Sequence, residues 1–164
     1  RPVMHVHLLT RPDGSVIVVG LAPKARRDGE PDATFAARVL ARTLEANPGW
    51  KGFPVVTMER VTVEPMLANR RFRNAWTVTA GVLTHDMGKA RALRLTEIRA
   101  ERDRRLATSD GPMLRTQETG TGPQIAAMTA YRQQLRDVPQ AIDLSGIVTP
   151  EALAAFEPIW PVSP

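Results

Sequence analysis

The 164-residue sequence contains no cysteine. Disulfide bonds, thiolate nucleophiles and cysteine-based zinc or iron–sulfur sites are therefore excluded. No apolar run approaches the ~20 residues of a membrane-spanning helix, which predicts a soluble protein made in a cytoplasm. Aromatic residues are scarce, with four phenylalanines, three tryptophans and one tyrosine. We therefore expect a modest hydrophobic core, or two small ones, with part of the stability supplied by an assembly or a partner.

Recognisable catalytic patterns are missing as well. The serines lie in expected turns or near the C-terminus, and none stands in a Gly-x-Ser-x-Gly nucleophile elbow. No glycine-rich phosphate loop precedes an expected helix. Glu97, Glu101 and Asp103 lie among arginines on an expected helix, where ion pairing accounts for them. The sequence predicts a protein that is not an enzyme and needs no cofactor.

His5 and His7 form the best candidate for a metal site. Residues i and i+2 of a strand point to the same face, so the two imidazoles could converge on one ion. A third ligand would have to come from a distant residue such as His85. Because two histidines on a strand are more often ordinary surface or half-buried residues, we expect no metal site here.

The sequence is rich in basic residues, with 22 lysines and arginines against 17 acidic residues and a net charge of +5. Such a balance permits binding to nucleic acid or to an acidic protein surface. The charges are spread along the chain, however, and acidic residues are interleaved with the arginines. This distribution favours a solvated surface of mixed charge.

The first half of the sequence predicts a small antiparallel sheet with one helix. The turn residues Arg11-Pro12-Asp13-Gly14 separate two segments rich in valine and leucine and predict a hairpin. Asp32 is the expected N-cap of a helix that Asn47-Pro48-Gly49 ends. The expected strands cover residues 3–10, 16–21, 55–63 and 76–82.

From residue 86 to residue 138 the sequence predicts an arginine-rich helical hairpin. A polar loop over residues 109–122 joins its two helices, and Pro123 suits the first turn of the second helix, which Pro139 ends. Arg102 occupies a position in the first apolar stripe where an apolar residue is expected. The stripes consist of Met87, Ala90, Leu95, Ile98 and Leu106 in the first helix, and of Ile125, Met128, Tyr131, Leu135 and Val138 in the second.

A short helix and an extended tail are expected at the end of the chain. Thr149 at the N-cap and Pro150 at the first helical position predict a helix that reaches Phe156, and Pro158-Ile159-Trp160-Pro161 follows as an apolar tail. The sequence as a whole predicts an α+β protein. Residues 1–80 form a small α+β domain, and residues 81–164 form the helical hairpin with its C-terminal tail.

The segment from Arg70 to Trp76 permits two interpretations. Its arginines and two aromatic residues could neutralise phosphates and stack on bases, which would make the protein an arginine-rich nucleic-acid binder. Alternatively, Phe72 and Trp76 are structural anchors in the core, and the arginines extend outward into solvent. The scarcity of aromatic residues favours the anchors.

The same segment opens a resemblance to a known group of proteins. Phe72-Arg73-Asn74-Ala75-Trp76, the arginine-rich helix from Ile98 to Leu106, Tyr131-Arg132-Gln133-Gln134-Leu135-Arg136-Asp137-Val138-Pro139 and the closing Trp160-Pro161 are arranged as in phage tail assembly chaperone-like and tail-fibre-associated proteins of proteobacterial phages and prophages. In order and spacing the resemblance covers about residues 67–164. This chain has Gly111-Pro112 where the group often has a tryptophan.

The resemblance implies a non-enzymatic protein of the phage tail, made in the host bacterial cytoplasm and located in the virion tail. Its implied partners are other tail or tail-fibre subunits, or copies of itself in a symmetric tail assembly; it has no membrane partner, and a nucleic-acid partner is not expected. An assembly chaperone that is absent from the mature virion is the alternative. The expected partner-binding residues are Arg102, Tyr131, Arg132, Leu135, Arg136, Ile159 and Trp160.

Overall fold

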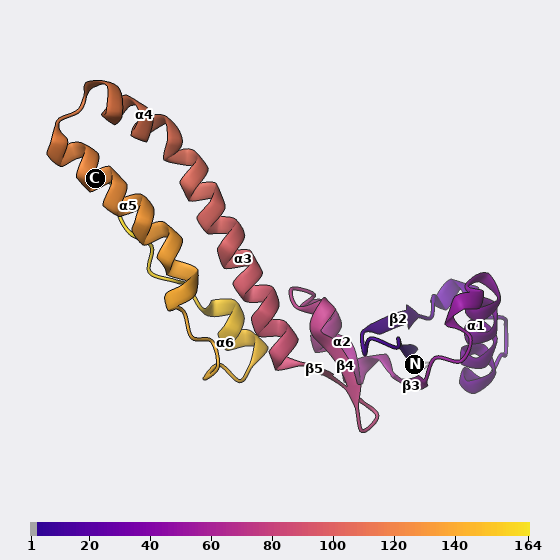
Figure 1. Ribbon diagram of the computed structural model, residues 1–164. Coiled ribbons are helices and arrows are strands. Elements are labelled where there is room, and N and C mark those ends of the chain that lie inside the picture. Colours follow the sequence, from indigo (N-terminus) through magenta and orange to yellow (C-terminus); the bar gives the residue numbers. More distant parts are fainter. Residues whose placement is uncertain (1–2) are drawn as a thin grey trace. The chain divides into compact units, whose positions relative to one another are not determined.

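A computed structural model describes residues 3–164 of the chain (Figure 1). The chain divides into two compact units, of which the first ends at Asp86 and the second runs from Met87 to Pro164. We call them the sheet unit and the helical unit, because the strands of the described residues lie in the first and the second contains four α-helices. The predicted α+β class is confirmed.

The sheet unit begins with a three-stranded antiparallel sheet. Its strands are β1 (His5–Thr10), β2 (Val16–Gly20) and β3 (Val55–Glu59), in the order β2-β1-β3. The predicted β1–β2 hairpin is confirmed, with Gly14 at a φ of 78° and its N–H donating to the Arg11 carbonyl at 2.9 Å. A positive φ is readily adopted by glycine, which explains why this residue ends the turn.

Helix α1 (Asp32–Ala46) follows a short 3-10 helix, η1 (Pro23–Ala25). The expected capping role of Asp32 is wrong, because Pro31 occupies the N-cap and no side chain caps the helix. Asp32 instead lies in the first turn, where its carboxylate pairs with Arg26 at 2.5 Å. A second 3-10 helix, η2 (Pro48–Trp50), follows α1 at the predicted stop signal.

The predicted strand over residues 55–63 is only half correct. Strand β3 ends at Glu59, and the chain continues as helix α2 (Arg60–Ala68). Packing explains the helix: three apolar side chains recur at helical spacing and contact the core that contains Val6 and Leu8. These side chains are Val63, Met66 and Leu67.

The predicted strand over residues 76–82 is a hairpin instead. Strands β4 (Trp76–Thr79) and β5 (Val82–His85) form a separate two-stranded sheet. Ala80 and Gly81 both have positive φ, 50° and 77°, as a tight two-residue turn requires. The domain boundary expected from the sequence lies inside this hairpin, which remains whole in the sheet unit.

Two hydrophobic clusters stabilise the sheet unit. The larger one joins the two sheets and helix α2, and its buried members are Val6, Leu8, Val63, Trp76 and Leu83. The smaller one packs α1 onto the chain after β2, and its buried members are Leu21, Phe35 and Ala36. The two clusters contain two of the eight aromatic residues, Trp76 in the larger one and Phe35 in the smaller one.

The helical unit consists of α3 (Met87–Thr108), α4 (Asp110–Thr119), α5 (Gly122–Ala141) and α6 (Pro150–Ala155). The predicted helix pair is present as α3 and α5. The predicted polar loop over residues 109–122 is wrong, because α4 occupies most of it. Pro112 lies in the first turn of α4, where the missing N–H of proline removes no helical hydrogen bond.

The ends of these helices follow from local chemistry. Pro139 lies inside α5 rather than after it, so the predicted stop at this residue is wrong; only the last turn follows it. Gly120 ends α4, with its N–H donating to the Thr116 carbonyl at 2.9 Å. The predicted cap of α6 is confirmed, since the Ala152 N–H donates to Thr149 Oγ1 at 3.2 Å.

Candidate interaction surface on the helical unit

A narrow apolar seam holds α3 against α5 and α6. Its buried residues come from all three helices and from the loop before α6, and they are Ala90, Ile98, Met128, Leu135, Pro139, Leu144 and Leu153. The other members of the predicted α3 stripe, Met87, Leu95 and Leu106, are half-buried. A seam this thin leaves the inner faces of the helices with few apolar contacts, and polar groups complete the packing.

Arg94 lies within the seam, between Ala90 and Ile98 on α3, and only 8% of its side chain is exposed. Its guanidinium group donates to the Phe156 carbonyl at 2.5 Å and to Glu97 Oε2 at 2.9 Å. A charged donor satisfies a carbonyl more strongly than a neutral one. Arg94 therefore fastens the start of the C-terminal tail (residues 156–164) to the middle of α3.

Arg91 fastens the loop between α5 and α6 in the same way, donating to the Ile147 carbonyl at 3.0 Å. The loop has its own local order, because the Ser145 N–H donates to Asp143 Oδ1 at 2.8 Å. This backbone hydrogen bond holds the pKa of Asp143 below its usual value. The result is a loop with a defined path along α3.

Arg132 on α5 fastens the junction of α3 and α4. It donates to the Leu106 carbonyl at 3.1 Å and to Ser109 Oγ at 2.5 Å, and it pairs with Asp110 at 2.7 Å. Only 17% of the Arg132 side chain is exposed, and its contacts lie inside the unit. The structure therefore places this predicted partner-binding residue in an intramolecular role.

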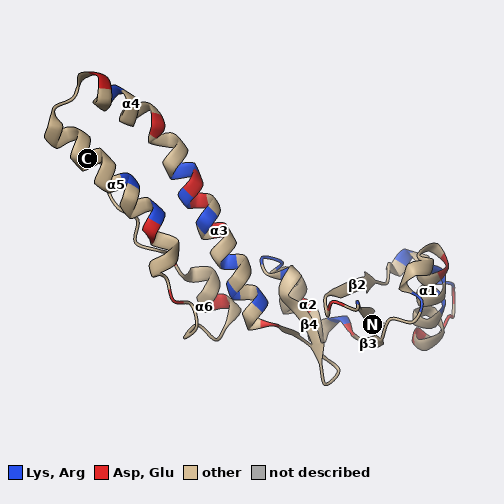
Figure 2. Cartoon of the chain, in the orientation of Figure 1, with Lys and Arg blue, Asp and Glu red and all other residues tan. Residues whose placement is uncertain are grey.

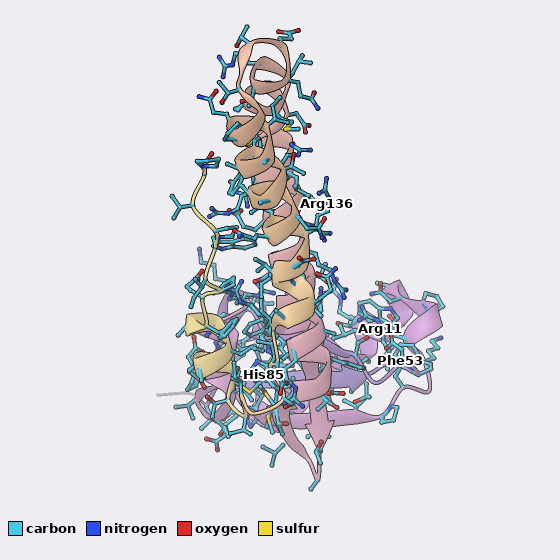
Figure 3. The ribbon with its side chains drawn as sticks, turned by 60° about the vertical axis from the view of Figure 1, so that its left-hand side comes forward. Arg11, Phe53, His85 and Arg136 are labelled. Atoms are coloured by element: carbon cyan, nitrogen blue, oxygen red, sulfur yellow. The ribbon has the colours of Figure 1, made fainter. Side chains whose placement is uncertain are left out.

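The C-terminal tail is extended and lies along the helices. The guanidinium of Arg105 stacks over the Trp160 ring, 4.6 Å from its centroid. Ser163 lines one hollow with Tyr131, and Pro164 lines another with Met128. Figure 3 shows the tail as a thin pale-yellow trace that runs beside the helices.

The other predicted partner-binding residues lie in different environments. Leu135 is fully buried in the seam, so it is not available at the surface of this unit. Arg102 and Tyr131 are half-buried, and Arg102 Nε donates to Asp103 at 2.7 Å. Arg136 is exposed on α5 (Figure 3).

Two apolar side chains of the tail point into solvent. Ile159 is 94% exposed and Val162 is 89% exposed, on either side of the Trp160 that Arg105 holds. Exposed aliphatic side chains on a positioned backbone can be covered by a partner at low entropic cost, because the segment is already ordered. This exposed pair is the clearest candidate for a contact surface in the described part of the unit.

The charges of α3 before Glu97 are all basic, and from Glu97 to Arg105 acidic and basic residues are interleaved (Figure 2). Glu101 pairs with both Arg104 and Arg105. Glu101 and Arg105 are half-buried and Arg104 is exposed. Ion pairs at a protein surface contribute little to stability, about 0.2–1 kcal/mol each. The predicted solvated, mixed-charge face is present on the outer side of this helix.

Phe72 and Trp76 of the sheet unit are 2% and 3% exposed. Rings buried to this degree cannot stack on bases unless the unit opens.

His7 is also buried, with Nδ1 bonded to Thr57 Oγ1 and Nε2 to the Ala36 carbonyl, both at 2.8 Å. Burial lowers the pKa of His7, and within residues 3–164 no group of three or more histidines and acids could hold a metal ion.

Sequence reasoning missed Arg91 and Arg94, which are central to the geometry of the helical unit. Ala90, Arg94 and Ile98 are spaced four residues apart, which places Arg94 on the buried face of α3 and could have indicated its role.

No helix within residues 3–164 is long and apolar enough to cross a membrane.

The model of the phage tail assembly chaperone protein family matches residues 95–164. No curated protein and no solved structure gives a significant match. The matched region begins inside α3 and includes α4, α5, α6 and the whole tail. The resemblance expected from the sequence is therefore confirmed over these residues: this part of the chain is similar to phage tail assembly chaperone proteins, and the similarity supports a role related to the phage tail.

Proposed function

We propose that the protein is a non-enzymatic tail assembly factor that binds another phage tail or tail-fibre subunit through its helical unit. The family match over residues 95–164 carries this proposal. It covers the tail, with its two exposed aliphatic side chains, and Arg105, which stacks on Trp160 of this tail. Arg94, which binds the start of the tail, lies one residue before the matched region. A surface of this kind is suited to holding another protein.

Ile159 and Val162 are the proposed contact residues. They are the two most exposed of the large hydrophobic side chains in the described chain, and they lie three positions apart on an extended segment. Trp160 is less suitable as a contact residue because its ring already packs on Arg105. Replacing Trp160 would loosen the tail, and the loss of binding would then have two explanations.

The test is co-purification of tail and tail-fibre subunits with the tagged full-length chain. The double variant I159D/V162D should bind at least about tenfold more weakly, because hot-spot side chains each contribute about 2 kcal/mol or more. V61D is the matched control: Val61 is 75% exposed but belongs to the sheet unit. Equal retention of the partner by the double variant and by wild type would exclude the tail as the contact.

Two forms of this function differ in whether the protein stays in the virion after assembly or is released from it. The family match is compatible with both: a built-in tail component would remain in the finished particle, whereas an assembly chaperone would leave it. Quantitative mass spectrometry of purified virions decides between them. A fixed number of copies per particle establishes a virion component, and depletion during purification establishes a released chaperone.

A further inference from the structure

A small basic cavity lies in the sheet unit, outside the region that the family model matches. Its volume is about 200 Å³, and it opens beside strand β2 and the start of β4. The lining residues are Arg11, Val16, Val18, Arg70, Arg73, Asn74 and Trp76. Three guanidinium groups and no carboxylate therefore surround one hollow.

The local fold forces two of these arginines together. Phe72 and Ala75 are buried and fix the segment after α2 to the core. Around Phe72 the chain makes a turn in which the Arg73 N–H donates to the Arg70 carbonyl at 3.1 Å. The apolar residues point inward, so the side chains of Arg70 and Arg73 are left on the outer side at the cavity.

The guanidinium groups of Arg70 and Arg73 have no hydrogen-bond or ion-pair partner among residues 3–164. Among residues 3–164, the guanidinium group of Arg11 donates only to the Ser15 hydroxyl, at 3.0 Å. The acid of the same turn, Asp13, accepts from the Ser15 N–H and hydroxyl and does not line the cavity. By contrast, the guanidinium groups of Arg26, Arg38 and Arg94 each have a carboxylate or a carbonyl as partner.

A buried donor accompanies the three cations. Trp76 lines the cavity, is 3% exposed, and its Nε1–H has no hydrogen-bond partner in the described chain. A buried donor without a partner costs free energy, about 1–3 kcal/mol. A ligand with oxygen acceptors in the cavity would offer that donor a partner, directly or through a bound water.

We propose that this cavity binds the carboxylate of an acidic side chain in a peptide segment of a partner protein. Planar guanidinium groups match a carboxylate in two-point hydrogen bonding, and the hollow has room for one such group. Single-stranded nucleic acid fits less well, because base stacking needs exposed rings and both aromatic residues of this segment are buried. This site is separate from the tail surface of the proposed function.

The experiment uses the full-length chain labelled with ¹⁵N and reads the indole N–H signals of its three tryptophans, Trp50, Trp76 and Trp160. The probe is a capped tetraglutamate peptide, with a capped tetraglutamine peptide as the neutral control. Titration with tetraglutamate should shift the Trp76 signal saturably and leave the Trp50 and Trp160 signals in place. Tetraglutamine should shift none of them, and added salt should weaken the effect.

The double variant R70Q/R73Q should bind tetraglutamate at least about tenfold more weakly, since charge-assisted hydrogen bonds are lost. R42Q is the matched control, because Arg42 is an exposed arginine on α1 in the same unit. Unchanged Trp50 and Trp160 signals in both variants show that the fold is retained.

Three results would overturn the proposal. They are a Trp76 signal that does not move, equal affinity of R70Q/R73Q and wild type for tetraglutamate, and a short single-stranded DNA or inorganic phosphate that shifts Trp76 at lower concentration than the peptide. The last result would assign the cavity to a phosphate ligand. None of these results depends on Ile159 or Val162.

Discussion

The two units use arginine in different ways. In the sheet unit, arginines pair with carboxylates near the surface, as Arg38 does with Glu30 at 2.6 Å, or line the basic cavity. In the helical unit, Arg91, Arg94 and Arg132 donate to backbone carbonyls of distant segments. In the sheet unit the partners are close in sequence, as in the hydrogen bond from Arg38 to the Ala25 carbonyl 13 residues away. In the helical unit arginines join segments 26 to 62 residues apart.

The difference follows from how much apolar surface each unit can bury. The sheet unit has two hydrophobic clusters, and three of its aromatic rings are buried: Phe35, Phe72 and Trp76. The seam of the helical unit contains no fully buried aromatic residue among the described ones. Hydrogen bonds from a charged donor, worth about 1.5–3 kcal/mol each, hold the loop and tail where apolar contacts are few.

The largest expected effect comes from breaking the seam itself. Leu135 is fully buried, so L135A should lower the free energy of unfolding by about 3 kcal/mol through lost contacts and the cavity left behind. Urea denaturation measures this change. L114A is the control, since Leu114 on α4 is 57% exposed and its loss should cost less than about 0.5 kcal/mol. Equal effects would mean that the seam does not hold the unit.

Removing the buried arginine should have the next largest effect. R94M keeps much of the side-chain volume but leaves the Phe156 carbonyl without its charged donor, which should cost about 2 kcal/mol. The tail should also loosen, and Trp160 fluorescence should shift to the red as its ring leaves Arg105. R99M on the exposed side of α3 should change neither property. If R94M and R99M behave alike, the fastening role of Arg94 is wrong.

A smaller loss is expected at the start of α6. T149A removes the hydroxyl that accepts from the Ala152 N–H, and a lost N-cap costs about 1 kcal/mol. T108A is the matched control, because the Thr108 hydroxyl donates only to the Arg104 carbonyl within its own helix. The unfolding free energies obtained from the denaturation curves of the two variants should differ by nearly the full contribution of the N-cap. Superimposed curves would show that α6 is held by Leu153 alone.

The smallest effect is expected only at acidic pH, and it tests the ion pair between Arg38 and Glu30 in the sheet unit. Arg38 donates to both oxygens of Glu30 and lowers the pKa of this carboxyl to about 2, from a reference value of 4.5. A lowered pKa in the folded state means that the pairing stabilises fully above pH 4.5. This stabilisation is lost as the pH falls from 4.5 toward 2.

The variants E30Q and R38Q should each remove the part of the pH dependence of the unfolding free energy that comes from Glu30. The double variant should remove no more than either single variant. Unfolding curves recorded across the acid range measure it. An acid dependence in E30Q that matches wild type would assign the loss of stability to other carboxylates.

Local signals in the sequence predicted the elements that local chemistry determines. Pro12 to Gly14 predicted the first hairpin, and Thr149-Pro150 predicted the last helix with its cap. Helix α2 was not predictable in this way, because its valines and Pro65 favour a strand or a break. The helix forms because it places Val63, Met66 and Leu67 on the core, which is a tertiary effect.

The candidate surface shows the same limit. The family resemblance and the apolar Ile159 were visible in the sequence, and the family match confirms the resemblance over residues 95–164. The sequence could not show that Arg94, among the arginines of α3, donates to a carbonyl 62 residues away, because the fold determines this partner. Leu135 was expected at a partner surface since apolar periodicity does not distinguish a seam from an exposed stripe.

The glycine that ends α4 has a consequence for how this sequence can vary. A Cβ atom at Gly120 would lie 2.4 Å from the Thr116 carbonyl oxygen, whereas one at Gly111, Gly122 or Gly146 would meet nothing within 4 Å. Substitution at residue 120 therefore requires the backbone to move, and the other three positions are open to side chains. Among related tail proteins, residue 120 should remain glycine while the neighbouring glycines are replaced freely.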